Sequence, residues 1–341
     1  MREVGCPIQQ AGRSVIRFHL HPWVWLVAQK VFYGLFTIAA VTVLVFFGLE
    51  LLPGDAASAM LGANANDESL ARLRQQLGLD RPVLTRYFEW LGGLVQGDLG
   101  NSMATNTPVA ATLVPRLLNS LVLTAIAAVA TFAIAGAVGV YAGLRAGSRT
   151  DRTLSGASLF AAGVPDFVTG VILIFIFSFT FGLLPGTSLF PLSEGPEGNM
   201  TKLVLPALTL IIANVGYSAR MIRAGVAETM NSEYVEFAVL NGLPQRTVIW
   251  RYSVRNALAP ALQVSSLTLL FMLSGVIVVE TLFQYPGIGQ MAVQATIAQD
   301  FVTISSLSVA VAALYVFVNI VTDAAILALS PRSKTVKGAT R

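Results

Sequence analysis

Six long apolar stretches constrain this chain more than any other feature of its sequence. A helix that crosses a bilayer needs roughly 20 mostly apolar residues, and the longest stretch, Leu117 to Leu144, runs for 28 residues without a charge. The others are Val31 to Leu52, Thr153 to Leu184, Leu203 to Ala219, Ala257 to Val279 and Phe301 to Ser330. The pattern predicts an all-α integral membrane protein with six transmembrane helices. The third stretch is the least regular, because it contains Pro165 and proline breaks helices.

The composition supports the same class. Only 12% of the residues are charged and 55% are hydrophobic, whereas a soluble protein carries roughly 25% charged residues. The single cysteine, Cys6, cannot form an internal disulfide. The two histidines, His19 and His21, have no further His or Cys at the spacing of metal ligands, so no metal site is predicted.

The basic residues predict how the chain is oriented. With six spans, both ends of the chain lie on one side of the membrane, and the segments on that side hold 16 Lys and Arg against 6 on the other. Loops rich in Lys and Arg stay in the cytoplasm, so both termini are expected there. We expect cytoplasmic tails at 1–30 and 331–341, a membrane domain at 31–330, an external loop at 53–116 and a cytoplasmic loop at 227–256.

The expected external loop, 53–116, carries signals for two short helices. Asp67 is a candidate N-cap and Gly78 a candidate stop for the first, and Pro82 opens the second. Apolar residues then recur at helical spacing, at Leu84, Tyr87, Phe88, Leu91 and Leu94. This pattern suits a small amphipathic cap packed on the membrane domain, which we favour, or a docking surface for an external partner.

Chemical motifs are scarce. No Gly-x-x-x-x-Gly-Lys-Ser/Thr pattern occurs, so the chain is not expected to bind ATP through a P-loop. The His-Glu-x-x-His and Gly-x-Ser-x-Gly patterns of hydrolases do not occur either, and no catalytic residue is predicted. Ionisable residues inside membrane spans are candidates for function. We assign a structural or gating role to Asp166, with its neighbour Pro165, and to Glu280 and Asp323.

The expected cytoplasmic loop reads as two helices joined by a sharp turn. Asn231 and Ser232 are candidate N-caps, and acidic residues then fall in the first turn, where the helix dipole favours them. Gly242 is a natural helix stop, and Pro244 a natural first-turn residue of the next helix. Apolar side chains on so short a charged hairpin, among them Tyr234, Val235, Phe237 and Leu240, indicate a protein partner.

The stretch "EYVEFAVLNGLPQRTVIWRYSVRNALAP" resembles the EAA loop of ABC-importer permeases, especially those of dipeptide, oligopeptide and nickel importers. The matching positions are Glu233, Tyr234, Val235, Ala238, Gly242, Asn256, Ala257 and Pro260. Other pieces match in the same order: "LLPGDAA", "LGLDRP", "GDLGNS", "LPALTL", "GVIVVETLFQYPGIGQ" and "SPR". The resemblance covers about residues 30 to 333. The chain departs from the family pattern at Asn241, Tyr252 and Asp166.

This resemblance implies a type I ABC-importer permease fold and a set of partners. A second, different permease would complete the pathway, two ATPase subunits would bind ATP and Mg, and an external solute-binding protein would deliver substrate. This chain itself would bind no cofactor and no nucleic acid, and it would lie in a bacterial or archaeal cytoplasmic membrane. The residues implied in ATPase coupling are Glu233, Tyr234, Val235, Ala238, Asn241 and Gly242. Asn256 joins the residues with a structural or gating role.

The resemblance leaves the substrate open. Di- or oligopeptides are expected first, and nickel or another small solute is the alternative. A self-sufficient secondary transporter or channel is the alternative of a different class, and it would transport without ATPase partners. No substrate-binding residue is predicted.

Overall fold

Every element that the structure describes is helical. The computed structural model describes residues 22–51, 54–61 and 66–329, and their side chains except those of 22–27, 255–264 and 325–329. Five of the helices are long and apolar enough to cross a membrane. They are α1 (Pro22–Glu50), α5 (Val109–Leu144), α8 (Met200–Met230), α11 (Arg255–Phe283) and α13 (Phe301–Leu329). The all-α prediction is confirmed, and these five helices match five of the six predicted spans.

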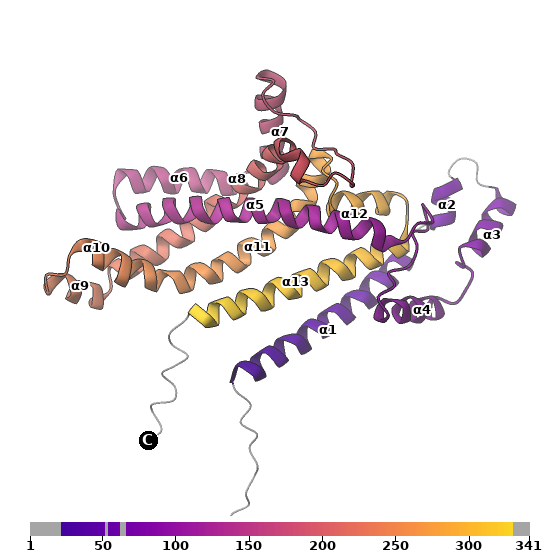
Figure 1. Ribbon diagram of the computed structural model, residues 1–341, viewed down its shortest axis with the longest axis horizontal. Helices are drawn as coiled ribbons and strands as arrows, with labels where there is room; N and C mark the ends of the chain where they lie inside the picture. The colour runs from indigo at the N-terminus through magenta and orange to yellow at the C-terminus, as the bar shows by residue number, and fades with distance from the viewer. Residues whose placement is uncertain (1–21, 52–53, 62–65, 330–341) are drawn as a thin grey trace, which may run out of the picture.

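The remaining predicted span, which is the third along the chain, is broken. In place of one helix over 153–184 there are two, α6 (Arg149–Gly163) and α7 (Asp166–Leu173), and α7 continues in a wider π-helical turn, η2 (Ile174–Thr180). The two parts meet at an angle of 99°. Val164 is extended, with φ −88° and ψ 126°, because the ring of Pro165 disfavours helical geometry in the residue before it. Figure 1 shows α7 projecting from the bundle.

Helix α8 is the centre of the bundle, and α5 packs along it. Glycines allow the two backbones to approach. A Cβ on Gly139 of α5 would lie 2.7 Å from the carbonyl oxygen of Ala219, and one on Gly143 would lie 2.8 Å from the Cβ of Val226. The Gly-x-x-x-Gly pattern at 139–143 is thus a close-packing contact, as such patterns are in many membrane helices. On another side of α8, a Cβ on Gly216 would lie 2.2 Å from the carbonyl oxygen of Ser158 in α6.

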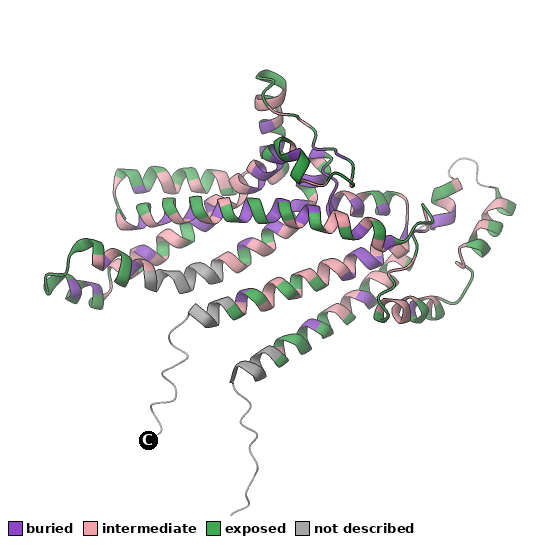
Figure 2. Ribbon diagram, viewed as in Figure 1, coloured by how far each residue is buried: buried purple, intermediate pink, exposed green. Residues whose placement is uncertain are grey.

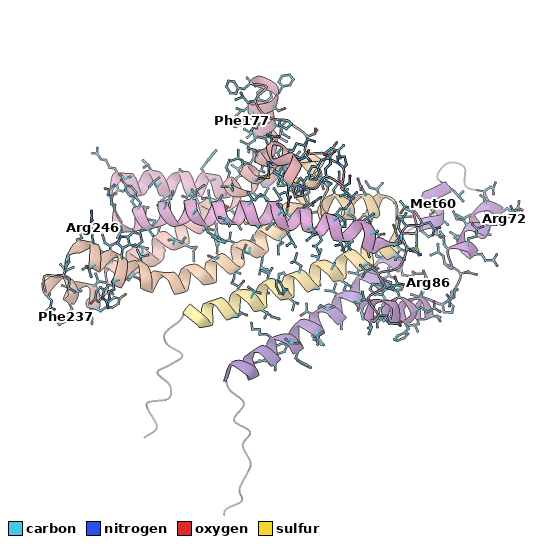
Figure 3. The ribbon with its side chains drawn as sticks, in the orientation of Figure 1. Met60, Arg72, Arg86, Phe177, Phe237 and Arg246 are labelled. Atoms are coloured by element: carbon cyan, nitrogen blue, oxygen red, sulfur yellow. The ribbon has the colours of Figure 1, made fainter. Side chains whose placement is uncertain are left out.

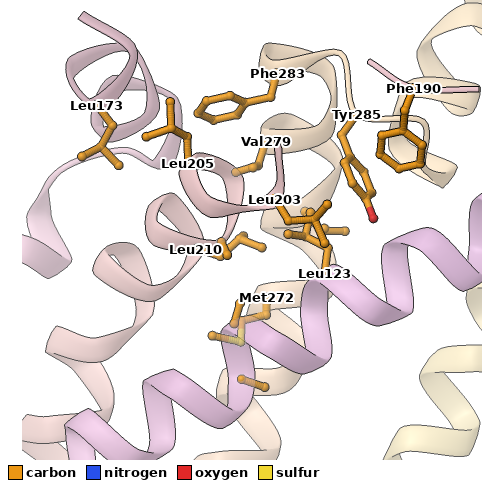
Figure 4. Close-up of a cluster of buried hydrophobic side chains, with 14 residues drawn as sticks. Leu123, Leu173, Phe190, Leu203, Leu205, Leu210, Met272, Val279, Phe283 and Tyr285 are labelled. Atoms are coloured by element: carbon orange, nitrogen blue, oxygen red, sulfur yellow. The ribbon is translucent and has the colours of Figure 1, made fainter. Parts of the chain in front are cut away.

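The main core lies where α5, α8 and α11 meet. Figure 4 shows Leu123, Leu203, Leu210 and Met272 gathered there. Figure 2 shows buried residues on the faces between helices and exposed ones on the outward faces. Helix α1 has the most open surface, with Phe32, Leu35, Phe36 and Leu44 all more than 60% exposed. In a bilayer such side chains contact lipid, which is as apolar as they are.

Helices α1 and α13 run side by side. An ion pair of 2.6 Å joins Lys30 of α1 to Asp323 of α13. Asp323 is one of the residues to which the sequence assigned a structural or gating role, and the structure places it between these two helices. Residues 22–30, which the sequence analysis placed in the N-terminal tail, are helical and belong to α1. Residues 331–341 lie outside the described part of the chain.

Within 53–116, the described residues ahead of α5 form three short helices at the end of the bundle opposite α9 and α10 (Figure 1). They are α2 (Ala56–Leu61), α3 (Asp67–Gln76) and α4 (Val83–Val95). Asn66 caps α3, one residue before the predicted Asp67, because its side chain accepts from the N–H of Ser69 at 2.7 Å. Gly78 follows α3 with φ +66°, as a helix stop requires.

Helix α4 rests on the long helices through polar contacts. The hydroxyls of Tyr87 and Thr42 lie 3.0 Å apart, Arg86 pairs with Glu50 at 2.6 Å, and the Trp90 indole donates to Ser306 at 3.3 Å. These contacts join α4 to α1 and α13. The outer face of α4 stays open, with Leu84 and Phe88 exposed. The segment therefore has the form of the predicted cap and keeps an apolar outer face.

The contact of α5 with α8 leads to the first prediction. Gly139→Ala should destabilise the protein by about 1–3 kcal/mol, the usual cost of overpacking, since the methyl group would meet backbone. Gly136→Ala, one turn away in the same helix, has nothing within 4 Å of its Cβ and should be neutral or slightly stabilising, because alanine favours helix. Thermal unfolding of the purified protein in detergent measures both. Equal midpoints for the two variants would contradict the close contact.

Candidate functional site

The candidate site is a hairpin that follows α8. It begins at Asn231, the C-cap of α8, and Ser232, the N-cap of the short helix α9 (Glu233–Leu240). Glu233 and Glu236 lie in the first turn of α9, where the helix dipole favours negative charge. Ser232 does not cap through its side chain, because its hydroxyl donates to the carbonyl of Thr229 in α8 instead. The helix begins where the sequence predicted.

Gly242 forms the turn of the hairpin. Its φ is +73°, in the left-handed region that favours glycine. The N–H of Gly242 donates to the carbonyl of Val239 at 2.9 Å, and that of Leu243 to Ala238 at 3.3 Å. This pair of bonds is a Schellman motif. The amide of Asn241 also donates to the carbonyl of Phe237 at 2.7 Å, so Asn241 satisfies the helix end.

The chain returns from this turn into α11. Pro244 is the N-cap of α10 (Gln245–Thr247), one residue before the first-turn place that the sequence suggested. A π-helical stretch, η4 (Val248–Val254), then leads directly into α11. The hairpin is therefore tied to α8 at one end and to α11 at the other. Asn256 follows in α11, but its side chain lies outside the described ones.

The hairpin has a small core of its own. Val235 and Ala238 of α9 are 2% and 3% exposed, and they pack with Val248, Met230 and Tyr252. The sequence assigned Val235 and Ala238 to ATPase coupling. Both side chains point inward, so within this chain they pack α9 against the returning arm of the hairpin, residues 245–254.

Other apolar side chains of the hairpin are exposed. The most exposed of them are Phe237, Val239, Leu240 and Trp250, and we call these four together the hairpin surface. Leu240 is 77% exposed and Phe237 69%. Figure 3 shows Phe237 and Arg246 at the far end of the molecule from Met60 and Arg72. Exposed apolar groups on a charged hairpin, outside the long apolar helices, are typical of a protein contact.

Glu280 lies at the other end of α11, where the chain turns into α12 (Ile288–Ile297). It is fully buried. Its carboxylate accepts from the Ser120 hydroxyl of α5 and from the N–H of Gly289 at 2.6 Å. A buried carboxylate needs such donors. Glycine at 287 leaves room for this carboxylate, because a Cβ there would overlap it.

Three further bonds fix this turn to α5. The Tyr285 hydroxyl donates to the carbonyl of Asn119 at 2.9 Å, the Asn119 amide donates to the carbonyl of Pro286 at 2.9 Å, and the N–H of Ile288 donates to Ser120 at 2.9 Å. The structure therefore gives Glu280 a structural setting. Sequence reasoning identified Glu280 but not Asn119 or Ser120, although two adjacent polar residues in an apolar run are a usable signal.

Asp166 begins α7, directly after Pro165. Its carboxylate faces α11 closely, since a Cβ on Gly275 would lie 2.5 Å from it. Asp166 thus lies where the broken span meets α11. Within the described residues the hairpin, the Glu280 turn and Asp166 are separate places, and α11 connects all three.

The comparisons with known proteins match nearly the whole chain. Residues 135–335 match the family described as binding-protein-dependent transport system inner membrane component, and residues 26–124 match the N-terminal part of the same kind of protein. A probable peptide ABC transporter permease of Sinorhizobium fredii is 30% identical over 86% of this chain and 94% of that protein.

Two other relatives are equally similar. A putative peptide transport system permease of Brucella abortus is 31% identical over 90% of this chain and 98% of that protein. The glutathione transport system permease of Escherichia coli is 31% identical over 86% and 94%. With its long apolar helices and its exposed hairpin, the chain belongs to the inner-membrane components of binding-protein-dependent transport systems.

Proposed function

We propose that this chain is the permease subunit of an ATP-driven ABC importer and forms half of a pathway for peptides. The observation that carries the proposal is the hairpin surface. It offers apolar side chains to a partner while the other face of α9 packs on its own chain. The sequence has no P-loop, so ATP and Mg would be bound by that partner, an ATPase subunit.

The proposed assembly has five members besides the lipid: this chain, a second, different permease, two ATPase subunits and an external solute-binding protein. The excess of Lys and Arg on one side supports a cytoplasmic hairpin and an external segment 53–116. The assembly would lie in a bacterial or archaeal cytoplasmic membrane. The inner-membrane family description supports the membrane and the binding protein.

The transport cycle would use the hairpin as a mechanical link. When ATP draws the two ATPase subunits together, α9 moves with the subunit that holds it. Because the hairpin is continuous with α8 and α11, that movement shifts two of the long helices. The permease pair would then change between inward-open and outward-open states, biased by nucleotide on one side and by the loaded binding protein on the other.

Peptides are the proposed substrate class, because the similar permeases are named for peptide or glutathione transport. Vesicles containing the complete complex should take up a labelled di- or oligopeptide when they hold ATP inside and the binding protein is supplied outside. The purified chain alone should transport nothing. Transport by the chain alone would favour a secondary transporter or channel, and uptake of nickel in place of peptide would contradict the substrate.

The hairpin surface leads to a cross-linking prediction. After the native Cys6 is replaced by serine, cysteines at Phe237, Leu240 and the exposed Glu233 should cross-link to an ATPase subunit with a short bifunctional maleimide. Ala238→Cys is the matched control on the same helix, and it should react poorly, since Ala238 is 3% exposed. Cross-linking at Ala238 but not at Phe237 or Leu240 would mean that the ATPase binds another face.

The turn at Gly242 leads to a prediction about coupling. Gly242→Val should raise ATP hydrolysis per peptide transported, because a branched side chain is strained at this φ by at least about 1–2 kcal/mol and would misplace α9. Gly242→Asn is the control, since asparagine tolerates left-handed geometry and nothing else lies within 4 Å of the Cβ. Hydrolysis and uptake are measured on the same vesicles. Normal coupling in Gly242→Val would rule out the turn as the reason for glycine.

A further inference from the structure

An ion pair joins α6 to α8 near the hairpin, and it links a buried Asp151 to an Arg223 side chain that is 31% exposed. The Arg223 guanidinium of α8 donates to both carboxylate oxygens of Asp151 in α6, from Nη2 to Oδ2 at 2.6 Å and from Nε to Oδ1. The Asp151 residue is 2% exposed. A two-pronged contact of this kind fixes the angle between the groups as well as their distance.

Asp151 also organises the turn that joins α5 to α6. Its carboxylate accepts from the N–H of Gly147 at 2.8 Å and from the Ser155 hydroxyl at 3.3 Å. The N–H of Asp151 donates to the hydroxyl of Ser148, the N-cap of α6, at 3.1 Å. One side chain thus joins the end of the α5–α6 turn, the start of α6 and the last third of α8.

The same level of α8 is in close contact with α5. A Cβ on Gly143 would lie 2.9 Å from the carbonyl oxygen of Arg223. The three helices therefore have no freedom to slide where the ion pair lies. Arg223 is seven residues before Met230, the last residue of α8, which is about 10 Å along an α-helix. Met230 in turn packs against the core of the hairpin.

We propose that Asp151 and Arg223 are a positioning pair that passes movement of the hairpin from α8 into α5 and α6. This inference rests on the proposed function, in which an ATPase moves α9. Helix α8 is unbroken between the pair and the hairpin, so it transmits displacement as a rod. Helix α6 carries the displacement on to the bend at Pro165 and so to α7.

The chemistry of the pair fits a positioning role better than a role in stability alone. Burying the Asp151 carboxylate costs desolvation, and apolar side chains of similar size often stabilise a protein as well as or better than an ion pair. What the ion pair adds is a fixed register between two helices. No other ion pair among the described residues joins α6 to α8.

The test uses the complete complex in vesicles with its binding protein, ATP and a labelled peptide. Asp151→Asn removes the charge with little change in shape, and Arg223→Lys keeps the charge but loses the two-pronged contact. ATP hydrolysed per peptide transported should rise at least about fivefold in both, the lower end of coupling between sites. Arg152→Lys, an exposed neighbour, is the matched control and should keep the wild-type ratio.

A second measurement separates positioning from folding. The amount of assembled complex and its thermal midpoint are determined for each variant, and a raised ratio in complexes that assemble to the wild-type amount assigns the effect to positioning and not to folding. A wild-type ratio in both single variants, whatever their stability, would overturn the inference. Failure of the wild-type complex to couple ATP to uptake would instead count against the proposed function.

Discussion

The close approach of α5 and α8 is the contact on which the rest of the bundle depends. In lipid there is no hydrophobic force between helices, so association rests on packing and on the hydrogen bonds that close contact permits. Gly139 and Gly143 let α5 come within reach of the α8 backbone, and Gly216 does the same for α6. Once these three helices are set, α8 can also contact α7 and α11. A larger side chain at any of these glycines would separate several helix pairs together.

Among the described residues, the buried carboxylates have partners from the backbone or from another helix. Glu280 has Ser120 and the N–H of Gly289, and Asp151 has Arg223 and the N–H of Gly147. Each carboxylate joins segments that are far apart in the sequence, which is why its loss would leave an unpaired polar group in each of them. Both lie near the ends of the long helices, where a turn must be held in one arrangement. These two buried carboxylates lie at turns, and apolar side chains pack between the helices along the spans.

The sequence predicts the elements of this fold better than their contacts. Apolar length identifies α1, α5 and α13, and the left-handed geometry that glycine permits identifies the turn at Gly242. Pro165 indicates an irregular span, but not the 99° bend. The pairing of Asp151 with Arg223 could not be predicted, because the two residues are 72 positions apart. Nor could the sequence say which side of α9 faces inward, since Val235 and Phe237 are both apolar.

That last distinction matters for how the hairpin can act. Its inner core of Val235, Ala238 and Val248 holds the two arms together, and its Schellman turn satisfies the end of α9. A partner that binds Phe237 and Leu240 would therefore move the hairpin as one rigid body. A loose loop would absorb the same displacement in its own backbone, whereas this hairpin is continuous with α8 and α11. The small core is thus what allows force applied at an exposed surface to reach the buried helices.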